Sequence, residues 1–273
     1  MFSGFRSALL LVLLVSGATT ASSRELRVCA DPNNLPFSNA QLEGFENKII
    51  DVLAQDMGAT VTYTWWAQRR GFVRNTLTAD ICDLVPGTTA GLAMLRTTVP
   101  YYRSSYVFVT RPDVSAVALL DDPVLRSLRI GVHLIGDDGF NVPPAHALAL
   151  RGIVGNVRGF SIYGDYREPN PPARLINAVA AGEIDVAIAW GPLGAYFAAR
   201  HEPPLRVTRV QPTRDLGFPM TFPIAMGVRR GDNVFKHEIE TAIARNRAEI
   251  DRILADFKVP RVDAFSQLAR PQP

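Results

Sequence analysis

The sequence predicts an α/β protein with two lobes, each a mainly parallel sheet flanked by helices, and two connections between the lobes. Strand-like apolar runs alternate with helical runs along residues 26–85, and the alternation restarts at residue 128. A linker-like Arg111-Pro112-Asp113 separates the two series, and a further strand and a long helix follow the second one. Two strand–helix series that are linked by two crossings of the chain indicate a fold with two lobes.

The chain is long enough for two modest domains or one large one, since it has 273 residues of which 47% are hydrophobic. Its formal net charge is +3, and the small excess of arginine is scattered along the chain rather than gathered in a basic stripe. Binding to nucleic acid is therefore not expected.

The N-terminus has the pattern of a secretory signal peptide. Arg6 is the only charged residue before Arg24, an apolar run covers residues 8–15, and small residues follow up to Ala21. Such a run is too short to span a bilayer as a stable helix. We expect residues 1–21 to be cleaved off near Ala21, which leaves a soluble exported protein.

The first series reads strand, helix, strand, helix, strand over residues 26–31, 45–57, 60–66, 71–78 and 82–85. Its first helix is predicted because apolar residues recur every fourth position from Phe45 to Met57, and Gly58 ends it. Right-handed crossovers between the successive strands would make this sheet parallel.

The second series contains the most regular stretch of the chain. Prolines at 169, 171 and 172 precede a predicted helix at 173–181, which Gly182 ends. Residues 184–190 are apolar except for Asp185, a pattern typical of a strand buried on both faces of a parallel sheet. The other expected elements are strands at 106–110, 128–132, 157–163, 205–210 and 223–229, helices at 144–150 and 193–200, and one long helix from Asp232 or Asn233 to Phe257.

This order predicts that the first lobe is split in sequence. Lobe 1 would comprise residues 22–111 and 214–273, and lobe 2 would be the inserted residues 112–213, with connections near 111–114 and 211–216. A single doubly wound domain with one long sheet is the alternative that the length leaves open.

Cys29 and Cys82 are the two cysteines of the chain. An oxidising compartment and their places on neighbouring predicted strands favour a disulfide. Their staggered positions along those strands could exceed bonding distance. Both readings stay open.

No pattern indicates a catalytic centre or a cofactor. The four histidines lack metal-ligand spacing, and the acidic pairs Asp121-Asp122 and Asp137-Asp138 lack the alternating oxygen ligands of a calcium loop. Nucleophile-elbow, P-loop and dinucleotide-binding motifs are absent from the sequence. Glu46 could form a carboxylate pair with Asp31, but a role at the start of a helix explains it at least as well. We expect no enzyme activity and no cofactor.

Aromatic and polar residues cluster at the predicted strand ends, where ligands bind in open α/β sheets. In the first lobe these candidates are Asp31, Asn33, Asn34, Phe37, Trp65, Trp66, Gln68, Arg69, Gly87, Thr88, Tyr101 and Tyr102. In the second lobe they are Asp137, Asp138, Tyr163, Trp190 and Gly191. Core packing is the alternative for any single aromatic residue, and we favour it for Tyr63, Tyr106 and Phe108.

Three motifs together resemble one family. They are CADPNNLPFSN at 29–39, TTVPYYRSSYVFV at 97–109, and the run from Tyr163 to Trp190. With the signal peptide and the split-lobe order they resemble type II periplasmic solute-binding proteins, and within them the binding-protein-like family associated with quinoprotein (PQQ) dehydrogenases. The J protein of bacterial methanol oxidation systems is the best-known member.

The resemblance implies a periplasmic protein that works with a PQQ-dependent alcohol or methanol dehydrogenase and its cytochrome c, and assists maturation or activation of the enzyme. Amino-acid binders of this fold hold the ligand carboxylate with an arginine and a Gly-Thr-Thr loop. Here Arg96 is too close to Pro100 for a match, and the second lobe opens with GVHLIGDDG at 131–139.

We therefore expect the cleft to receive the dehydrogenase rather than an amino acid. A transport receptor that delivers a small polar or organic solute to an ABC permease is the alternative.

Overall fold

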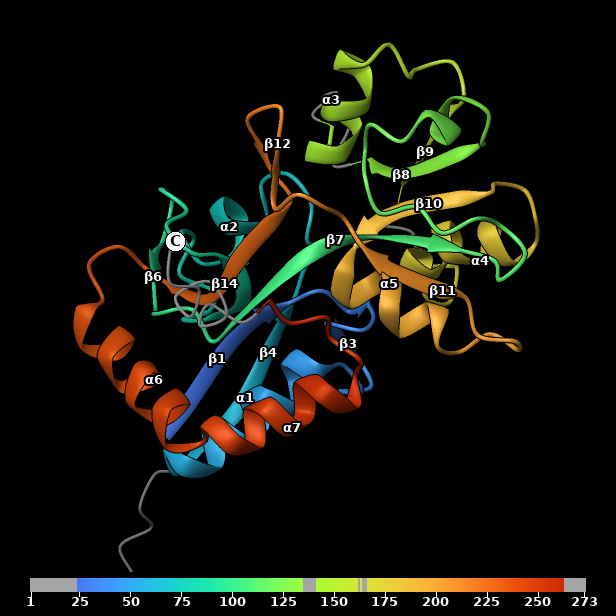
Figure 1. Ribbon diagram of the computed structural model, residues 1–273. Helices are drawn as coiled ribbons and strands as arrows, with labels where there is room; N and C mark the ends of the chain where they lie inside the picture. Colours follow the sequence, from blue (N-terminus) through green and yellow to red (C-terminus); the bar gives the residue numbers. More distant parts are fainter. Residues whose placement is uncertain (1–23, 135–140, 162, 164–165, 263–273) are drawn as a thin grey trace, which may run out of the picture.

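A computed structural model gives the structure of the protein and describes residues 24–134, 141–161, 163 and 166–262 (Figure 1). The expected signal peptide at 1–21 and the candidates Asp137 and Asp138 lie outside the described residues. Within the described ranges, no helix combines the length and the apolar character needed to cross a membrane.

The helices and strands alternate as an α/β protein requires, and the predicted fold class is confirmed. The helices are α1 Phe45–Asp56, α2 Phe72–Asn75, α3 Pro143–Leu150, α4 Arg174–Ala180, α5 Gly191–Ala198, α6 Asn233–Arg245 and α7 Arg247–Asp256, with 3-10 turns at Pro123–Arg126 and Pro171–Ala173. The strands are β1 Arg24–Ala30, β2 Asn33–Asn34, β3 Ser38–Asn39, β4 Ala59–Trp65, β5 Val85–Thr89, β6 Arg96–Thr97, β7 Tyr102–Thr110, β8 Ile130–Leu134, β9 Val157–Ser161, β10 Val186–Trp190, β11 Arg206–Arg209, β12 Arg214–Asp215, β13 Phe218–Pro219 and β14 Thr221–Val228.

The first lobe begins as the sequence predicts. β1 and β4 pair in parallel, and α1 buries Ile49 and Leu53 beneath α6 and α7 (Figure 1). The third strand differs from the expected 82–85. Leu84 alone forms a parallel bridge to Val28, and β5 starts one residue later and runs antiparallel to β14.

A mixed sheet links the two lobes, with strands in the order β5-β14-β7-β10-β8-β9. β8 pairs in parallel with β9 and β10, whereas β7 and β14 run antiparallel to their neighbours because they carry the chain across between the lobes and back.

The long strand β7 belongs to both lobes. Its residues 102–105 pair with β14, and its residues 106–110 pair with β10 and β11. In Figure 1 it runs as one continuous arrow from the lower lobe to the upper one. We place the division of the lobes inside β7 and at the start of β14, a few residues away from the 111–114 and 211–216 expected from sequence.

The second lobe packs β10 between helices. Residues Val186–Ala189 are fully buried, with α4 and α5 against the strand, and Gly182 ends the preceding helix with a φ of +71°. The expected single C-terminal helix is instead two helices, because Asn246 leaves helical geometry and its side-chain amide donates to the carbonyl of Ala242.

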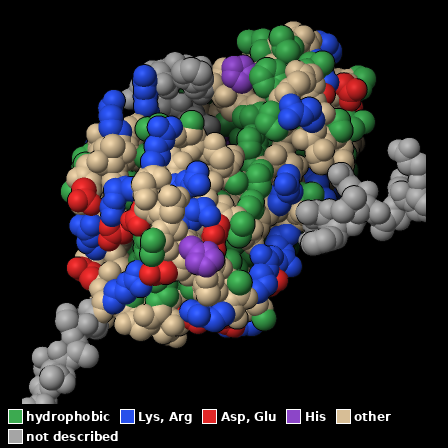
Figure 2. Space-filling view, turned by 90° about the vertical axis from the view of Figure 1, so that its left-hand side faces the viewer, with side chains coloured by type: hydrophobic (Ala, Val, Ile, Leu, Met, Phe, Trp, Pro, Cys, Tyr) green, Lys and Arg blue, Asp and Glu red, His purple; other side chains and the backbone are tan. Residues whose placement is uncertain are grey.

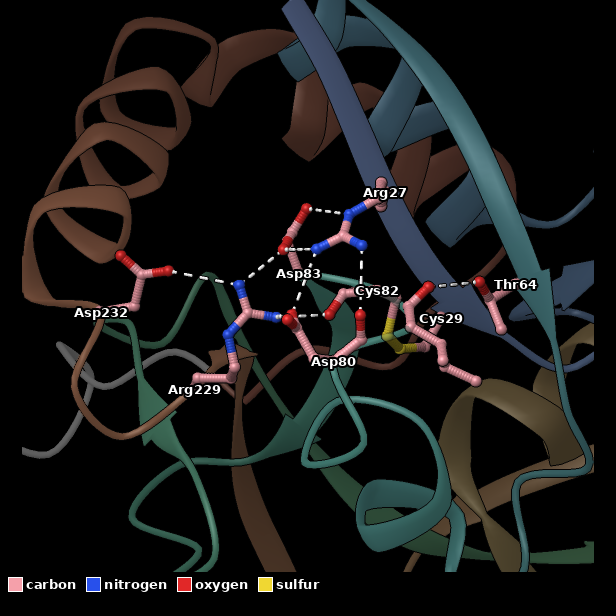
Figure 3. A network of polar contacts seen from close by, with 9 residues as sticks. Arg27, Cys29, Thr64, Asp80, Cys82, Asp83, Arg229 and Asp232 are labelled. Atoms are coloured by element: carbon pink, nitrogen blue, oxygen red, sulfur yellow. Dashed lines mark hydrogen bonds and ion pairs between the residues drawn. A yellow bond between two sulfur atoms is a disulfide. The ribbon is translucent and has the colours of Figure 1, made fainter.

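Cys29 and Cys82 form a disulfide, with both residues buried and their Cα atoms 5.7 Å apart. An ionic network lies beside it (Figure 3). The Asp83 carboxylate accepts hydrogen bonds from Arg27 at 2.7 Å and from Arg229 at 2.6 Å, and these two guanidinium groups hold the Asp83 pKa below its ordinary value. The disulfide and the network join β1 to the end of β14.

Candidate functional site

A pocket of about 440 Å³ opens between the two lobes, a size typical of small-molecule sites. In Figure 2 it lies in a hollow whose walls are mostly hydrophobic. Strand ends and loops of both lobes form it. Its lining consists of Asn34, Phe37, Glu46, Gln68, Gly87, Thr88, Thr89, Tyr102, Tyr106, His133, Val142, Pro143, Tyr163, Trp190, Leu193, Phe222 and Ile224.

The structure brings eight of the sequence candidates together in this lining. They are Asn34, Phe37, Gln68, Gly87, Thr88 and Tyr102 from the first lobe, and Tyr163 and Trp190 from the second. Asn34, Gln68, Tyr163 and Trp190 end or follow a strand, where the rule for open α/β sheets places ligand sites, whereas Gly87 and Thr88 lie within β5 and Tyr102 begins β7.

Two polar candidates lie beside the pocket and position its loops. The Asp31 carboxylate accepts hydrogen bonds from the backbone N–H of Asn33 at 2.9 Å and of Gln68 at 2.7 Å. It therefore positions the backbone of Gln68, whose residue lines the pocket. The Asn33 side-chain amide donates to the carbonyl of Glu168 at 2.8 Å, and its oxygen accepts from the N–H of Asn170 at 3.2 Å. Asn33 therefore ties the first lobe to a loop of the second.

The remaining described candidates are outside the lining. Trp65 stacks on Tyr63 with ring centroids 4.6 Å apart, and Trp66 is 41% exposed. Tyr101 is fully buried, and its hydroxyl donates to the carbonyl of Pro86. Arg69 is not among the residues around the pocket.

Gly191 is not part of the pocket lining. It begins α5, and a β-carbon there would come 2.4 Å from the carbonyl oxygen of Ser105. The glycine is needed for the close approach of α5 to β7.

Aromatic rings form one continuous wall of the pocket. Trp190 packs edge to face on Tyr106 at 5.5 Å and on Phe222 at 5.9 Å between ring centroids. Tyr106, which the sequence assigns to the core, is buried and also lines the pocket. Phe222 was missed because it lies near the start of a strand that the sequence places at 223–229.

Glu46 is the most unusual residue in the lining. It is 4% exposed, and in the described part of the chain no hydrogen bond or ion pair to its carboxyl is found. Burial raises the pKa of Glu46 to about 8. From the sequence, we interpret Glu46 as a residue that stabilises the start of a helix. In the structure Asn47 does this instead, since its side-chain oxygen accepts hydrogen bonds from the N–H groups of Gly44 and Asn39.

His133 approaches the pocket from β8 and is 3% exposed. Its Nε2 atom has no hydrogen-bond partner among the residues that the structure describes, and burial lowers the pKa of the imidazole to about 4, so the ring is neutral at pH 7. From the sequence, we test the histidines only as metal ligands. Its position at a predicted strand end is the signal that would have placed it in the cleft.

The chemistry of the pocket is that of a binding site. Among the described lining residues none is a lysine or arginine, and Glu46 is the sole carboxylic acid. No three His, Cys, Asp or Glu side chains of the described ranges gather closely enough to hold a metal ion. An apolar cavity with a few polar groups selects a ligand by shape and hydrogen bonding.

The fold with this cleft defines a class, the periplasmic binding proteins. The crystal structure of periplasmic binding protein XoxJ from Methylobacterium extorquens AM1 matches with a TM-score of 0.71 and 34% identity, over 87% of this chain and 99% of that one. No protein-family model matches the chain.

Two curated proteins narrow the class to a family. Protein MoxJ of Paracoccus denitrificans is 30% identical over 257 residues, which are 91% of this chain and 93% of that protein. Protein MoxJ of Methylorubrum extorquens is 32% identical over 249 residues, 86% and 81% of the respective lengths. The chain belongs to the MoxJ family, and the resemblance to the J proteins of methanol oxidation systems is confirmed.

Proposed function

We propose that the protein is a non-enzymatic periplasmic accessory factor of a PQQ-dependent alcohol or methanol dehydrogenase system, and that its cleft binds the dehydrogenase during maturation or activation. Membership of the MoxJ family supports the system. The single observation that carries the binding mode is the aromatic wall built by Trp190, Tyr106 and Phe222. Buried aromatic residues are the usual anchors of protein interfaces.

A transport receptor for a small solute is the second candidate. The pocket volume of about 440 Å³ suits a small ligand, which favours this reading. The absence of lysine and arginine from the described lining residues speaks against a carboxylate ligand such as an amino acid, because a buried carboxylate needs a cationic or well-placed N–H partner.

The test is association of the purified protein with the dehydrogenase, with and without its cytochrome c, measured by calorimetry. Replacing Trp190 by Ala should weaken association by about thirtyfold, since truncating a central aromatic anchor typically costs about 2 kcal/mol. Trp66→Ala is the matched comparison, because Trp66 lies outside the pocket. Both tryptophans are cleft candidates in the sequence, but Trp190 lines the pocket and Trp66 does not, so we expect the larger effect from Trp190→Ala.

Thermal melts of both variants are needed beside the binding curves, because Trp190 also packs against the cores of both lobes. Unchanged association of a well-folded Trp190→Ala protein would contradict binding in this cleft. A complex that forms only when a small solute is absent would favour the receptor.

A further inference from the structure

The unpartnered polar groups of the pocket identify the chemistry that it is built to accept. Two buried atoms of the lining, the side-chain oxygen of Asn34 and the Nε2 atom of His133, have no hydrogen-bond partner among the described residues. Glu46 lines the pocket as well and is 4% exposed, and no hydrogen bond or ion pair to its carboxyl is found in the described part of the chain. A buried polar group without a partner costs roughly 1–3 kcal/mol, more for a carboxylate, so a ligand that satisfies these groups recovers that energy. Of the three, only the Glu46 carboxyl acquires a charge near neutral pH.

The surroundings of Glu46 favour a cation. Phe37 and Tyr102 line the pocket beside it. Burial raises the phenol pKa values of Tyr102 and Tyr163, and the nearby Glu46 carboxylate raises both a little further. Aromatic faces attract cations, most strongly where water is excluded. An anionic ligand would find the Glu46 carboxyl, a neutral His133 and no lysine or arginine among the described lining residues.

We propose that this pocket binds an alkylammonium group, with the Glu46 carboxylate as its counter-ion and the aromatic wall around its carbon atoms. The inference rests on the proposed function in one respect: if the ammonium group comes from the dehydrogenase, the dehydrogenase must bind in this cleft. The ammonium group can belong to a lysine side chain of the dehydrogenase or to a free amine, and the two sources are separated below.

The protonation state of Glu46 gives the proposal a signature. The pKa of Glu46 is about 8, so the carboxylate that pairs with a cation is a minor form at pH 6. Ammonium affinity should therefore rise about fiftyfold from pH 6 to pH 8.

The tyrosine and histidine side chains near Glu46 do not change their charge between pH 6 and pH 8. The phenols of Tyr63, Tyr101, Tyr102 and Tyr163 have raised pKa values, and His133 titrates near pH 4. Burial raises the pKa of Asp31 above its ordinary value against the opposing effect of two backbone N–H groups, but Asp31 lies outside the lining, and the loss of pH dependence in Glu46→Gln separates the two acids. A change in affinity between pH 6 and pH 8 therefore reports Glu46.

The first experiment uses the mature protein alone. Calorimetry at pH 6 and pH 8 compares n-butylammonium and tetramethylammonium with 1-butanol and butyrate. We expect both ammonium probes to bind at least tenfold more tightly than 1-butanol or butyrate at pH 8, with the pH dependence given above. Equal affinity for butylammonium, butanol and butyrate would overturn the proposal.

Glu46→Gln keeps the shape of the protonated side chain and removes the charge. It should lower ammonium affinity at pH 8 at least tenfold and abolish the pH dependence. Asp51→Asn is the matched control, since it makes the same change on α1 outside the pocket. If the Gln variant does not fold, Gly87→Ala serves instead, because its β-carbon would come 1.9 Å from the Glu46 Oε1 atom and displace the carboxyl. Retained affinity in a folded variant would contradict the assignment.

The second experiment identifies the source of the ammonium group. The dehydrogenase is acetylated on its lysines, which removes their charge, or reductively methylated, which keeps it. Loss of the complex on acetylation alone, with competition by butylammonium, assigns the pocket to a partner lysine. Glu46-dependent butylammonium binding without any dehydrogenase complex supports a free amine and sinks the accessory function. A complex that acetylation leaves unchanged, together with no binding of either ammonium probe, overturns the inference and leaves the proposed function standing.

Discussion

The carboxyl of Glu46 lies against the backbone of Gly87, so close that a β-carbon on that glycine would come 1.9 Å from Oε1. Glu46 is the second residue of α1, and Gly87 is the third residue of β5. The backbone of Gly87 is outside the left-handed region, so conformation alone does not call for glycine. Space for the buried acid is the reason for a glycine at this position.

Gly87→Ala should destabilise the protein by about 1–3 kcal/mol, the usual range for overpacking a buried site. Most of this loss should disappear in the double variant Gly87→Ala with Glu46→Ala, because the clash is then removed and the two changes are coupled. Urea unfolding of the two single variants and the double variant measures the coupling. Gly155→Ala is the control, since its added β-carbon meets no atom within 4 Å and should leave stability within about 0.5 kcal/mol.

The contribution of Glu46 to stability should fall as the pH rises from about 4.5 to about 8. Burial raises the folded-state pKa of Glu46 to about 8, whereas the unfolded chain has the ordinary value near 4.5. In this window the folded protein binds a proton that the unfolded chain has released, so each pH unit costs up to about 1.4 kcal/mol. Glu46→Gln should flatten the curve between pH 6.5 and pH 8 in urea melts. An unchanged slope would show that Glu46 is ionised in the folded protein.

His133 should weaken the protein on the acid side. Its folded-state pKa is about 4 and its ordinary value is 6.5, so the unfolded chain binds the proton first and stability is lost as the pH falls from about 6.5 to about 4. Glu46 acts in the opposite direction above pH 4.5, so the two effects partly cancel in the wild-type protein. In Glu46→Gln the acid loss should therefore stand out, and His133→Gln added to it should remove that loss. Persistence of the loss in the double variant would assign it to other groups.

Replacing Cys29 and Cys82 together by Ala should lower the free energy of unfolding by about 4 kcal/mol. The bond closes a loop of 53 residues, and releasing that loop in the unfolded chain accounts for the estimate. Guanidinium unfolding of the oxidised protein and the double variant tests it. The double variant should still bind the dehydrogenase, because neither cysteine lines the pocket.

The sequence predicted the fold and half of the pocket for one reason: both depend on strand ends. Periodicity marks where β1, β4 and β10 end, and the aromatic and amide residues there, such as Trp190 and Asn34, project into the cleft. Patterns of this kind need only local information.

The parts that could not be predicted depend on distant partners. Glu46 is equivalent in sequence to any acid at a helix start, and only the packing of Gly87 and β7 around it makes it a buried acid. Whether Tyr101 or Tyr102 faces the pocket depends on how the chain enters β7, which begins at Tyr102, because successive side chains of an extended chain point to opposite sides. The break at Asn246 depends on a side-chain hydrogen bond that helix periodicity does not contain.

β7 also determines how the cleft can move. Where the lobes meet, Ser105 pairs with Thr221 at the start of β14, so both connections are adjacent antiparallel strands held by backbone hydrogen bonds. Two paired strands resist bending in the plane of the sheet, whereas added twist keeps their hydrogen bonds. Opening or closing therefore requires torsion of this two-stranded ribbon, in which the second lobe rotates about the strand axis. In the proposed complex, a partner that changed the angle between the lobes would have to twist this ribbon.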